Sequence, residues 1–210
     1  MQTTFILDAV HAIRNTIVAN EAEIESLDRA IGDGDHYINM KRASEIVADM
    51  SSELDGQPAD IVLNKIGMKL LSTLGGASGP LFASFFIAMS KVAKENGHAS
   101  NLQTAAAFAA GVQSIIQRGK AGLGEKTMLD VLIPVSTSLT TLAAQDKNIK
   151  EIAQTLKQVA DEGLESTRNI IATKGRAASL GERAIGHLDA GAKSCQVMIH
   201  TVCDLILNVG

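Results

Sequence analysis

Three aspartates and a histidine lie close together in one short stretch of the chain, residues 27–40. The carboxylates of Asp28, Asp33 and Asp35 would repel one another at this spacing, and a divalent cation would relieve that repulsion. Two intervening glycines allow the backbone to fold the carboxylates towards one another. Because hard cations such as Mg2+ prefer oxygen ligands, the stretch predicts a metal site.

An EF-hand loop does not fit this stretch. Counted from Asp33 as the first loop position, Tyr37 takes the fifth position, Ile38 the place of the central glycine and Ser44 the place of the closing glutamate. A solvated turn followed by a helix cap is the simpler alternative, since Asp and Gly are common in turns. The other loops of the chain favour the metal site over the turn.

The composition favours a single all-helical domain. The chain has 210 residues, of which only 3% are aromatic and 3 are prolines. Alanine, leucine, isoleucine and methionine are plentiful, and unbranched side chains lose little rotamer freedom in a helix. A chain of this length buries about 70% of its unfolded surface, so we expect one domain over residues 1–210.

Charge, apolar patterning and cysteine spacing limit the classes of partner and the cell compartment that we expect for this protein. A net charge of -4 gives no global basic field for nucleic acid or an anionic membrane. Asp8, His11 and Arg14 interrupt the apolar N-terminus, unlike a signal peptide, and no apolar run reaches membrane-spanning length. Cys195 and Cys203 stand about 12 Å apart along one helical pattern, too far for a disulfide. We expect a soluble cytoplasmic protein with reduced, buried cysteines.

Apolar residues recur at helical spacing in eight segments. These segments cover residues 3–20, 37–50, 61–71, 81–92, 102–116, 128–142, 152–171 and 195–206. A short acidic turn is expected between the first segment and the aspartate stretch, and a polar turn over 51–58. Short links predict an antiparallel up-and-down bundle or barrel, in which the first, third, fifth and seventh connections share one end.

The odd-numbered connections are the ones rich in glycine, aspartate, histidine and arginine, whereas the others are plain polar turns. Carboxylate-bound Mg2+, helix N-terminal N–H groups and cationic side chains together hold nucleotide phosphates. The odd-loop end is therefore predicted to form one nucleotide site. The cations expected there are Arg118, Lys120, Lys126, Lys174 and Arg176.

Familiar nucleotide-binding motifs do not account for this end. Residues 119–127 approach the P-loop pattern, but Glu125 intrudes before Lys126, and the flanking segments are helical rather than a strand and a helix. No glycine pair follows a strand, as a dinucleotide fingerprint would require. In the third connection, Ser78 is predicted to cap the next helix, and Pro80 is tolerated in its first turn.

Four segments of the chain together resemble the L subunit of dihydroxyacetone kinases. They are the aspartate loop 27–36, the glycine-rich turn 75–81, the segment 118–130 and the long loop 174–187. The resemblance runs in order through nearly the whole chain. It implies an eight-helix antiparallel barrel with a nucleotide at one end, in agreement with the sorting of the loops.

The resemblance also implies an unusual kinase. Mg-bound ADP would stay on this chain, accept a phosphoryl group from a phosphohistidine of an M subunit, and pass it to dihydroxyacetone held by a K subunit. A separate L domain is typical of this phosphoenolpyruvate-dependent, phosphotransferase-type version, because ATP-dependent kinases of the family usually fuse the K and L domains.

Individual residues take roles from the same resemblance. Asp28, Asp33 and Asp35 match the carboxylates that hold two Mg2+ ions. With His36 and Arg176 they form the implied catalytic set, in which Arg176 reaches the phosphates of ADP or ATP. The implied nucleotide-binding residues are His36, Asn39, Ala77, Ser78, Gly119, Met128, Arg176, Asp189 and Gly191.

Some positions depart from the family pattern, and other functions stay open. Tyr37 stands in place of the usual glycine, residues 178–179 in place of Ser-Tyr, and Ala190 in place of proline. One alternative is a kinase for another short ketose such as erythrulose, and another is a relative of fatty-acid kinases. A third is a nucleotide-sensing regulatory protein that signals to a transcriptional regulator without contacting nucleic acid itself. A homodimer is also left open.

Overall fold

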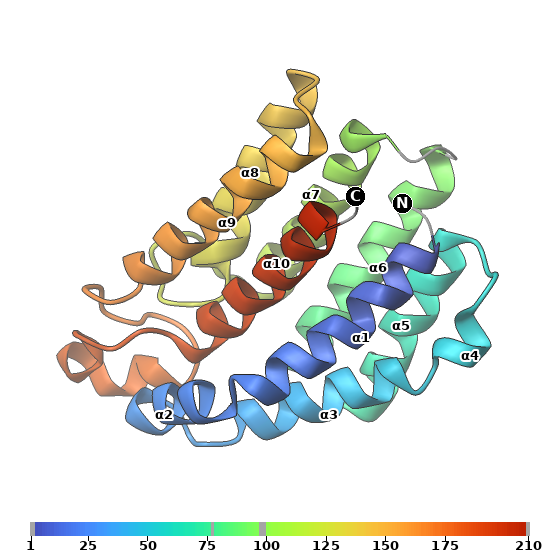
Figure 1. The fold of residues 1–210 in the computed structure, drawn as a ribbon. Helices are drawn as coiled ribbons and strands as arrows, with labels where there is room; N and C mark the ends of the chain where they lie inside the picture. The colour runs from blue at the N-terminus through green and yellow to red at the C-terminus, as the bar shows by residue number, and fades with distance from the viewer. Residues whose placement is uncertain (1–2, 77, 97–99, 209–210) are drawn as a thin grey trace.

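In the computed structural model, described over residues 3–76, 78–96 and 100–208, the chain is helical and contains no strand. This confirms the predicted all-α class. The elements, shown in Figure 1, are α1 Thr3–Ala19, α2 Glu21–Ile31, α3 His36–Ala48, α4 Ser51–Leu54, α5 Ala59–Thr73, α6 Ser78–Asn96, α7 Asn101–Gly119, α8 Leu129–Ala144, α9 Ile149–Ser166, the 3-10 helix η1 Arg176–Ala184, and α10 Ala190–Asn208.

Eight long helices of the described residues form a closed ring. Each helix packs against the next in the order α1, α3, α5, α6, α7, α8, α9 and α10, and α10 packs back against α1. Figure 1 shows the first and last helices, blue and red, side by side. The ring explains how helices with one apolar face bury that face without any sheet.

Three short elements were not predicted. The largest correction concerns α2, which occupies the place of the expected acidic turn. Ile24, Asp28 and Ile31 lie on one buried face of α2, as the spacing of four and three residues requires. The acidic residues around them form its exposed side. The other two elements are α4, within the expected turn 51–58, and η1. In addition, α9 ends at Ser166 rather than at residue 171.

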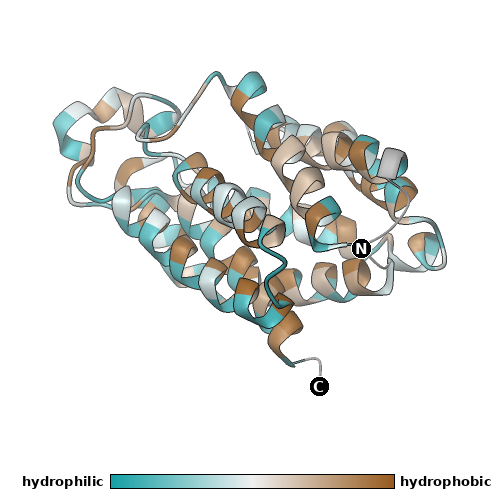
Figure 2. Ribbon diagram, turned by 90° about the horizontal axis from the view of Figure 1, so that it is seen from above, coloured by the Kyte–Doolittle hydropathy of each residue, from teal (hydrophilic) through white to brown (hydrophobic). Residues whose placement is uncertain are grey.

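The core consists of two large apolar clusters that meet at α6. One is built from α7, α8, α9 and α10, and the other mainly from α1, α3, α5 and α6. Phe82 and Phe85 pack against both clusters. The ring of Phe85 also meets the ring of Phe108 edge to face, with centroids 5.4 Å apart, a favourable aromatic geometry. Figure 2 shows apolar and polar residues interspersed along the long helices.

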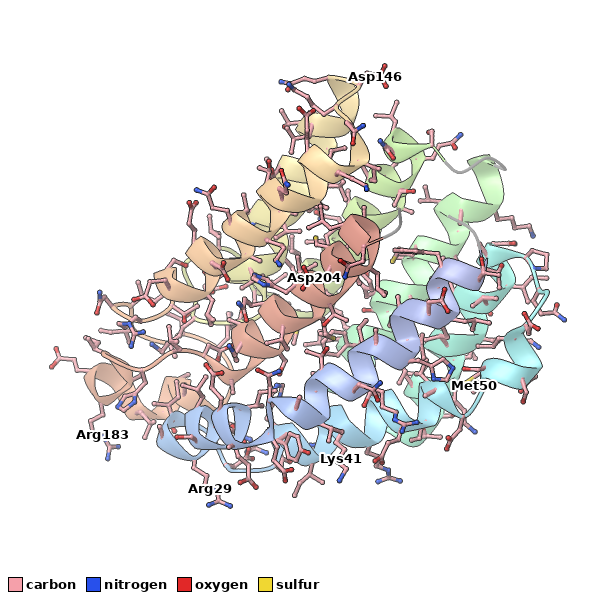
Figure 3. All side chains as sticks on the ribbon, in the orientation of Figure 1. Arg29, Lys41, Met50, Asp146, Arg183 and Asp204 are labelled. Atoms are coloured by element: carbon pink, nitrogen blue, oxygen red, sulfur yellow. The ribbon has the colours of Figure 1, made fainter. Side chains whose placement is uncertain are left out.

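The predicted sorting of the connections agrees with the fold. Figure 1 shows α2 and the connection from α9 to α10 at one end of the molecule, and the turn between α8 and α9 at the other. In Figure 3, Arg29 and Arg183 mark the first end and Asp146 marks the opposite end. Cys195 and Cys203 are buried and unpaired, as expected. None of the described helices is long and apolar enough to cross a membrane.

Candidate functional site

The three aspartates come together as the sequence predicts. Asp28, Asp33 and Asp35 each offer a carboxylate oxygen, and these oxygens all lie within 4.8 Å of one another. Asp28 is buried on α2, whereas Asp33 and Asp35 are exposed in the loop before α3. The backbone N–H of His36 donates to Oδ2 of Asp28 at 3.0 Å. One carboxylate is therefore fixed by the protein, and two face solvent.

Two glycines shape this loop for different reasons. A Cβ atom at Gly32 would lie 1.9 Å from Oδ1 of Asp28, so only glycine leaves room for the buried carboxylate. Gly34 has a φ of +79°, in the left-handed region that glycine adopts without strain. The sequence predicted glycine flexibility at both positions, and the structure shows that Gly32 is needed for space instead.

The donor set suits a hard divalent cation. All three side chains are carboxylates, and the group is the one cluster of potential metal ligands found among residues 3–76, 78–96 and 100–208. Mg2+ normally takes one or two protein carboxylates and keeps water or phosphate oxygens in its other positions. The exposure of Asp33 and Asp35 leaves space for such ligands.

Arg176 reaches the carboxylate cluster from the long connection between α9 and α10. Its Nε lies 2.7 Å from Oδ2 of Asp33, and its side chain is 76% exposed. Here η1, which begins at Arg176, packs against α2. An ion pair this exposed contributes at most about 1 kcal/mol, so the guanidinium is free to exchange Asp33 for another anion.

His36 connects the start of α3 to α10. Its Nε2 lies 2.8 Å from the hydroxyl oxygen of Ser194, which itself donates to the carbonyl of Ala190 at 3.1 Å. Because the hydroxyl has a single proton, this network assigns the Nε2 proton to His36. Burial lowers the pKa of His36, although Asp28 and its neighbouring carboxylates oppose this shift. Burial at this position thus favours the neutral form of the imidazole.

Sequence reasoning did not single out Ser194. It is fully buried inside α10, and a serine among small residues in an amphipathic helix carries no signal of its own. Only the packing of α10 against the start of the site brings its hydroxyl to His36.

A second group of predicted residues meets where α8 and α10 begin. Oδ2 of Asp189 accepts a hydrogen bond from the N–H of Ala192 at 2.7 Å, in the first turn of α10. A Cβ atom at Gly191 would lie 3.0 Å from that carboxylate oxygen and 3.7 Å from the backbone nitrogen of Met128. Burial is the main cause that raises the pKa of Asp189 from 3.8 to about 6.

The other predicted residues lie on the same end of the ring. Asn39 is on α3, and its amide nitrogen is 3.9 Å from where a Cβ atom of Gly76 would be. Ser78 is the first residue of α6 and Gly119 the last of α7. Ala77 lies outside the described residues, and with it the expected capping geometry of Ser78.

The predicted cluster of cations is only partly correct. Lys126 does not face a ligand: its side chain is buried, and its ammonium donates to backbone carbonyls. Lys174 lies 3.9 Å from Glu125. Arg118 lines a groove of about 440 Å³ between α5, α6 and α7. Of the five cations, Arg176 is the one that contacts the described carboxylate cluster.

Together these features define a class of protein: an all-helical barrel with a carboxylate-rich site built from the connections at one end. The chain belongs to the DAK2 domain family, whose model matches residues 30–204.

Curated relatives of this family match over most of their length. The chain is 38% identical over 184 residues to the ADP-binding subunit DhaL of the PEP-dependent dihydroxyacetone kinase of Escherichia coli K12, covering 87% of this chain and 88% of the relative. It is 41% identical over 186 residues to a DhaL subunit of Listeria innocua, covering 87% and 86%. It is also 32% identical to the D-erythrulose kinase of Mycolicibacterium smegmatis, but covers only 34% of that protein.

A solved structure has the same fold. The dihydroxyacetone kinase of C. freundii, in complex with AMP-PNP and Mg2+, superposes with a TM-score of 0.76 at 24% identity. The match covers 98% of this chain and 34% of that one.

Proposed function

We propose that this chain is the ADP-binding subunit of a phosphoenolpyruvate-dependent dihydroxyacetone kinase. The observation that carries the proposal is the carboxylate cluster of Asp28, Asp33 and Asp35, placed at the end of a barrel whose relatives are named as ADP-binding subunits. The identity to those subunits, 38 to 41%, exceeds the 31 to 32% identity to two erythrulose kinases. Dihydroxyacetone is therefore the favoured acceptor, and erythrulose is the second candidate.

The aspartates would hold Mg2+. The family resemblance suggests that two ions bind there. Mg2+ in the C. freundii kinase structure supports the choice of metal. When bound there, the metal would offset the negative charge of the carboxylates and of the phosphate groups. Asp28 is already fixed by the N–H of His36, so it provides the rigid ligand. Asp33 and Asp35, exposed on the loop, adjust to the remaining geometry.

The chain's own residues would bind and orient the nucleotide. Arg176 would exchange its exposed pair with Asp33 for a bidentate contact to phosphate oxygens. The N-termini of α3 and α6 would direct N–H groups towards the same charge. His36, tied to Ser194 on α10, would keep the start of α3 in place. Positioning and charge stabilisation, rather than covalent chemistry on this chain, would supply the rate.

The partners follow from this function. A phosphohistidine M subunit would deliver the phosphoryl group to bound ADP, and a K subunit would present dihydroxyacetone to the resulting ATP. Both would have to approach the exposed end that carries Asp33, Asp35 and Arg176. Signalling to a transcriptional regulator and homodimer formation are further roles that neither the site nor the relatives' names favour.

The test is to denature the purified protein and identify the released nucleotide by ion-exchange chromatography, with metal analysis of the same sample. We expect ADP and Mg2+. Asp33→Ala should release no ADP while keeping the helical circular dichroism of the parent. The control is Asp8→Ala, which removes an exposed carboxylate on α1 and should leave ADP bound. If the Asp33 variant retains ADP as the parent does, the metal assignment is wrong.

A further inference from the structure

Lys126 lies buried among backbone carbonyls that come from both ends of one long connection. Its Nζ donates to the carbonyls of Thr167 at 2.5 Å and His187 at 2.6 Å, and more weakly to those of Arg168 and Ile170 at 3.4 and 3.3 Å. Thr167, Arg168 and Ile170 directly follow α9, and His187 comes shortly before α10. One ammonium group thus joins the beginning and the end of residues 167–189.

The environment explains why a cation is stable there. The carbonyls at the end of a helix have no partners within the helix, and the negative end of its dipole favours positive charge. A buried ammonium is costly unless its donors are satisfied, and here carbonyls surround it. Burial lowers the pKa of Lys126, whereas Asp189 and Asp130 act in the opposite direction.

The loop that carries Lys126 is itself firmly held. The carboxylate of Asp130 accepts hydrogen bonds from the N–H groups of Gly124 and Thr127, at 2.5 and 2.8 Å. The neighbouring Glu125 adds a second link to the long connection, because its Oε1 accepts from the hydroxyl of Thr173 at 2.7 Å. Lys126 therefore ties the connection to a loop that is itself hydrogen-bonded to Asp130 in the first turn of α8.

The residues of the proposed site lie within the tied connection. Arg176 reaches Asp33 from its middle, and Asp189 lies at its end, beside Gly191 and Met128. A backbone hydrogen bond also joins the two ends of the connection: the N–H of Gly186 donates to the carbonyl of Arg168 at 2.8 Å. The positions of Arg176 and Asp189 thus depend on how the two ends of the connection are held together.

We infer that Lys126 is a positioning residue for the nucleotide site, which places Arg176 and Asp189 by tying together both ends of residues 167–189. The inference rests on the proposed function for the identity of the ligand, but not for the structural tie. Lys126 was expected among the cations at the site, and the geometry gives it a role through other residues instead.

The first experiment is a double-mutant cycle on the affinity for Mg-ADP, measured by isothermal titration calorimetry. We expect Lys126→Met to weaken binding about tenfold in the parent, and about twofold or less when Arg176 is already alanine, because residues that act through one another are not additive. A purely structural role would weaken binding by the same factor in both backgrounds. Lys157→Met, which removes an ion pair with Asp204 on the outer face of α9, is the matched control and should leave affinity unchanged.

The second experiment uses hydrogen exchange in the nucleotide-free protein, so it does not depend on the proposed function. We expect Lys126→Met to speed exchange over residues 168–187 and to leave α5 and α6 unchanged. Lys126→Gln, which keeps two N–H donors, should give a smaller effect of the same kind. Unchanged exchange, or equal loss throughout the molecule in both variants, would overturn the inference. A parent chain that binds no nucleotide would instead refute the proposed function, and the exchange result would still decide the role of Lys126.

Discussion

At the scale of single residues, the site depends on groups whose neighbours leave them little freedom. Asp28 is buried on α2 and receives the N–H of His36, and the backbone at Gly32 passes directly against its carboxylate. Asp189 is enclosed where α10 begins. Two predictions follow from this crowding, one steric and one electrostatic.

Gly32→Ala should abolish Mg-dependent nucleotide binding. The added Cβ would lie 1.9 Å from Oδ1 of Asp28, so the carboxylate must leave its position. Calorimetry with Mg-ADP measures the loss. Gly122→Ala is the control at the same end of the molecule, because its Cβ meets nothing closer than 3.9 Å. Equal affinity in both variants would show that Asp28 does not bind the metal.

Asp189→Asn should stabilise the protein increasingly as the pH rises. The pKa of Asp189 is about 6 in the folded protein, against an ordinary value of 3.8. The folded state therefore holds this proton more tightly than the unfolded chain, and ionisation costs stability between about pH 4 and 6. A shift of this size corresponds to about 3 kcal/mol.

Urea unfolding of parent and Asp189→Asn at pH 4 and pH 7, without nucleotide, tests this. The two proteins should differ little at pH 4, where Asp189 is protonated in the folded state. The variant should gain free energy of unfolding at pH 7, and the amide oxygen still accepts the N–H of Ala192. A difference that stays constant between the two pH values would contradict the raised pKa.

At the scale of elements, the helices that carry the site pack closely where glycines allow it. A Cβ atom at Gly163 on α9 would lie 2.6 Å from the carbonyl oxygen of Asp130 and 3.0 Å from the Cα of Val131. Both are backbone atoms of α8, close to the loop that holds Lys126. The two helices can thus approach this closely only because residue 163 has no side chain.

Gly163→Ala should destabilise the fold by about 1 to 3 kcal/mol, because overpacking at a backbone contact forces the helices apart. This outcome opposes intrinsic propensity, by which alanine stabilises a helix by about 1 kcal/mol relative to glycine. Chemical unfolding measures the change. Gln154→Ala, on the exposed side of the same helix, should change stability by less than about 0.5 kcal/mol. A more stable Gly163→Ala variant would mean that α8 shifts to make room for the added methyl group at little cost.

At the scale of the whole molecule, the ring closes through the two ends of the chain. The hydroxyl of Thr201 on α10 donates to that of Thr16 on α1 at 2.8 Å, and Lys193 pairs with Glu23 at 3.0 Å. Beneath these contacts, fully buried Ile17 belongs to a cluster with Tyr37 and residues of α2, α3 and α10. Because Tyr37 lies in the first turn of α3, this cluster holds the helix that directly follows the carboxylate loop.

Ile17→Ala should lower the free energy of unfolding by about 2 to 5 kcal/mol, as expected for a large side chain removed from a fixed core position. Unfolding should stay a single transition, because Phe82 and Phe85 join the two main clusters. Circular dichroism in urea tests both points. Val18→Ala, at a site 42% exposed, is the neighbouring control. Two separate transitions would show that the halves of the ring unfold independently.

The sequence by itself determined the helical class, most of the helix positions and the carboxylate cluster. Apolar spacing sets the helices, and the aspartates are close in space because they are close in the chain. Local sequence also contained the signal for α2, since Ile24, Asp28 and Ile31 fall on one helical face. Its many glutamates favoured a turn in the prediction, although they form the exposed side of this helix.

Only the tertiary structure decided how distant residues combine. Ser194 meets His36, and Lys126 binds the carbonyls of residues 41 and 61 positions away in the chain. Its charge and its loop placed Lys126 among the cations expected at the nucleotide site, whereas packing buries its side chain among backbone carbonyls. The reason is physical: whether a cation faces solvent or a cage of carbonyls depends on which helix ends the closed ring brings beside it, and no local pattern encodes that meeting.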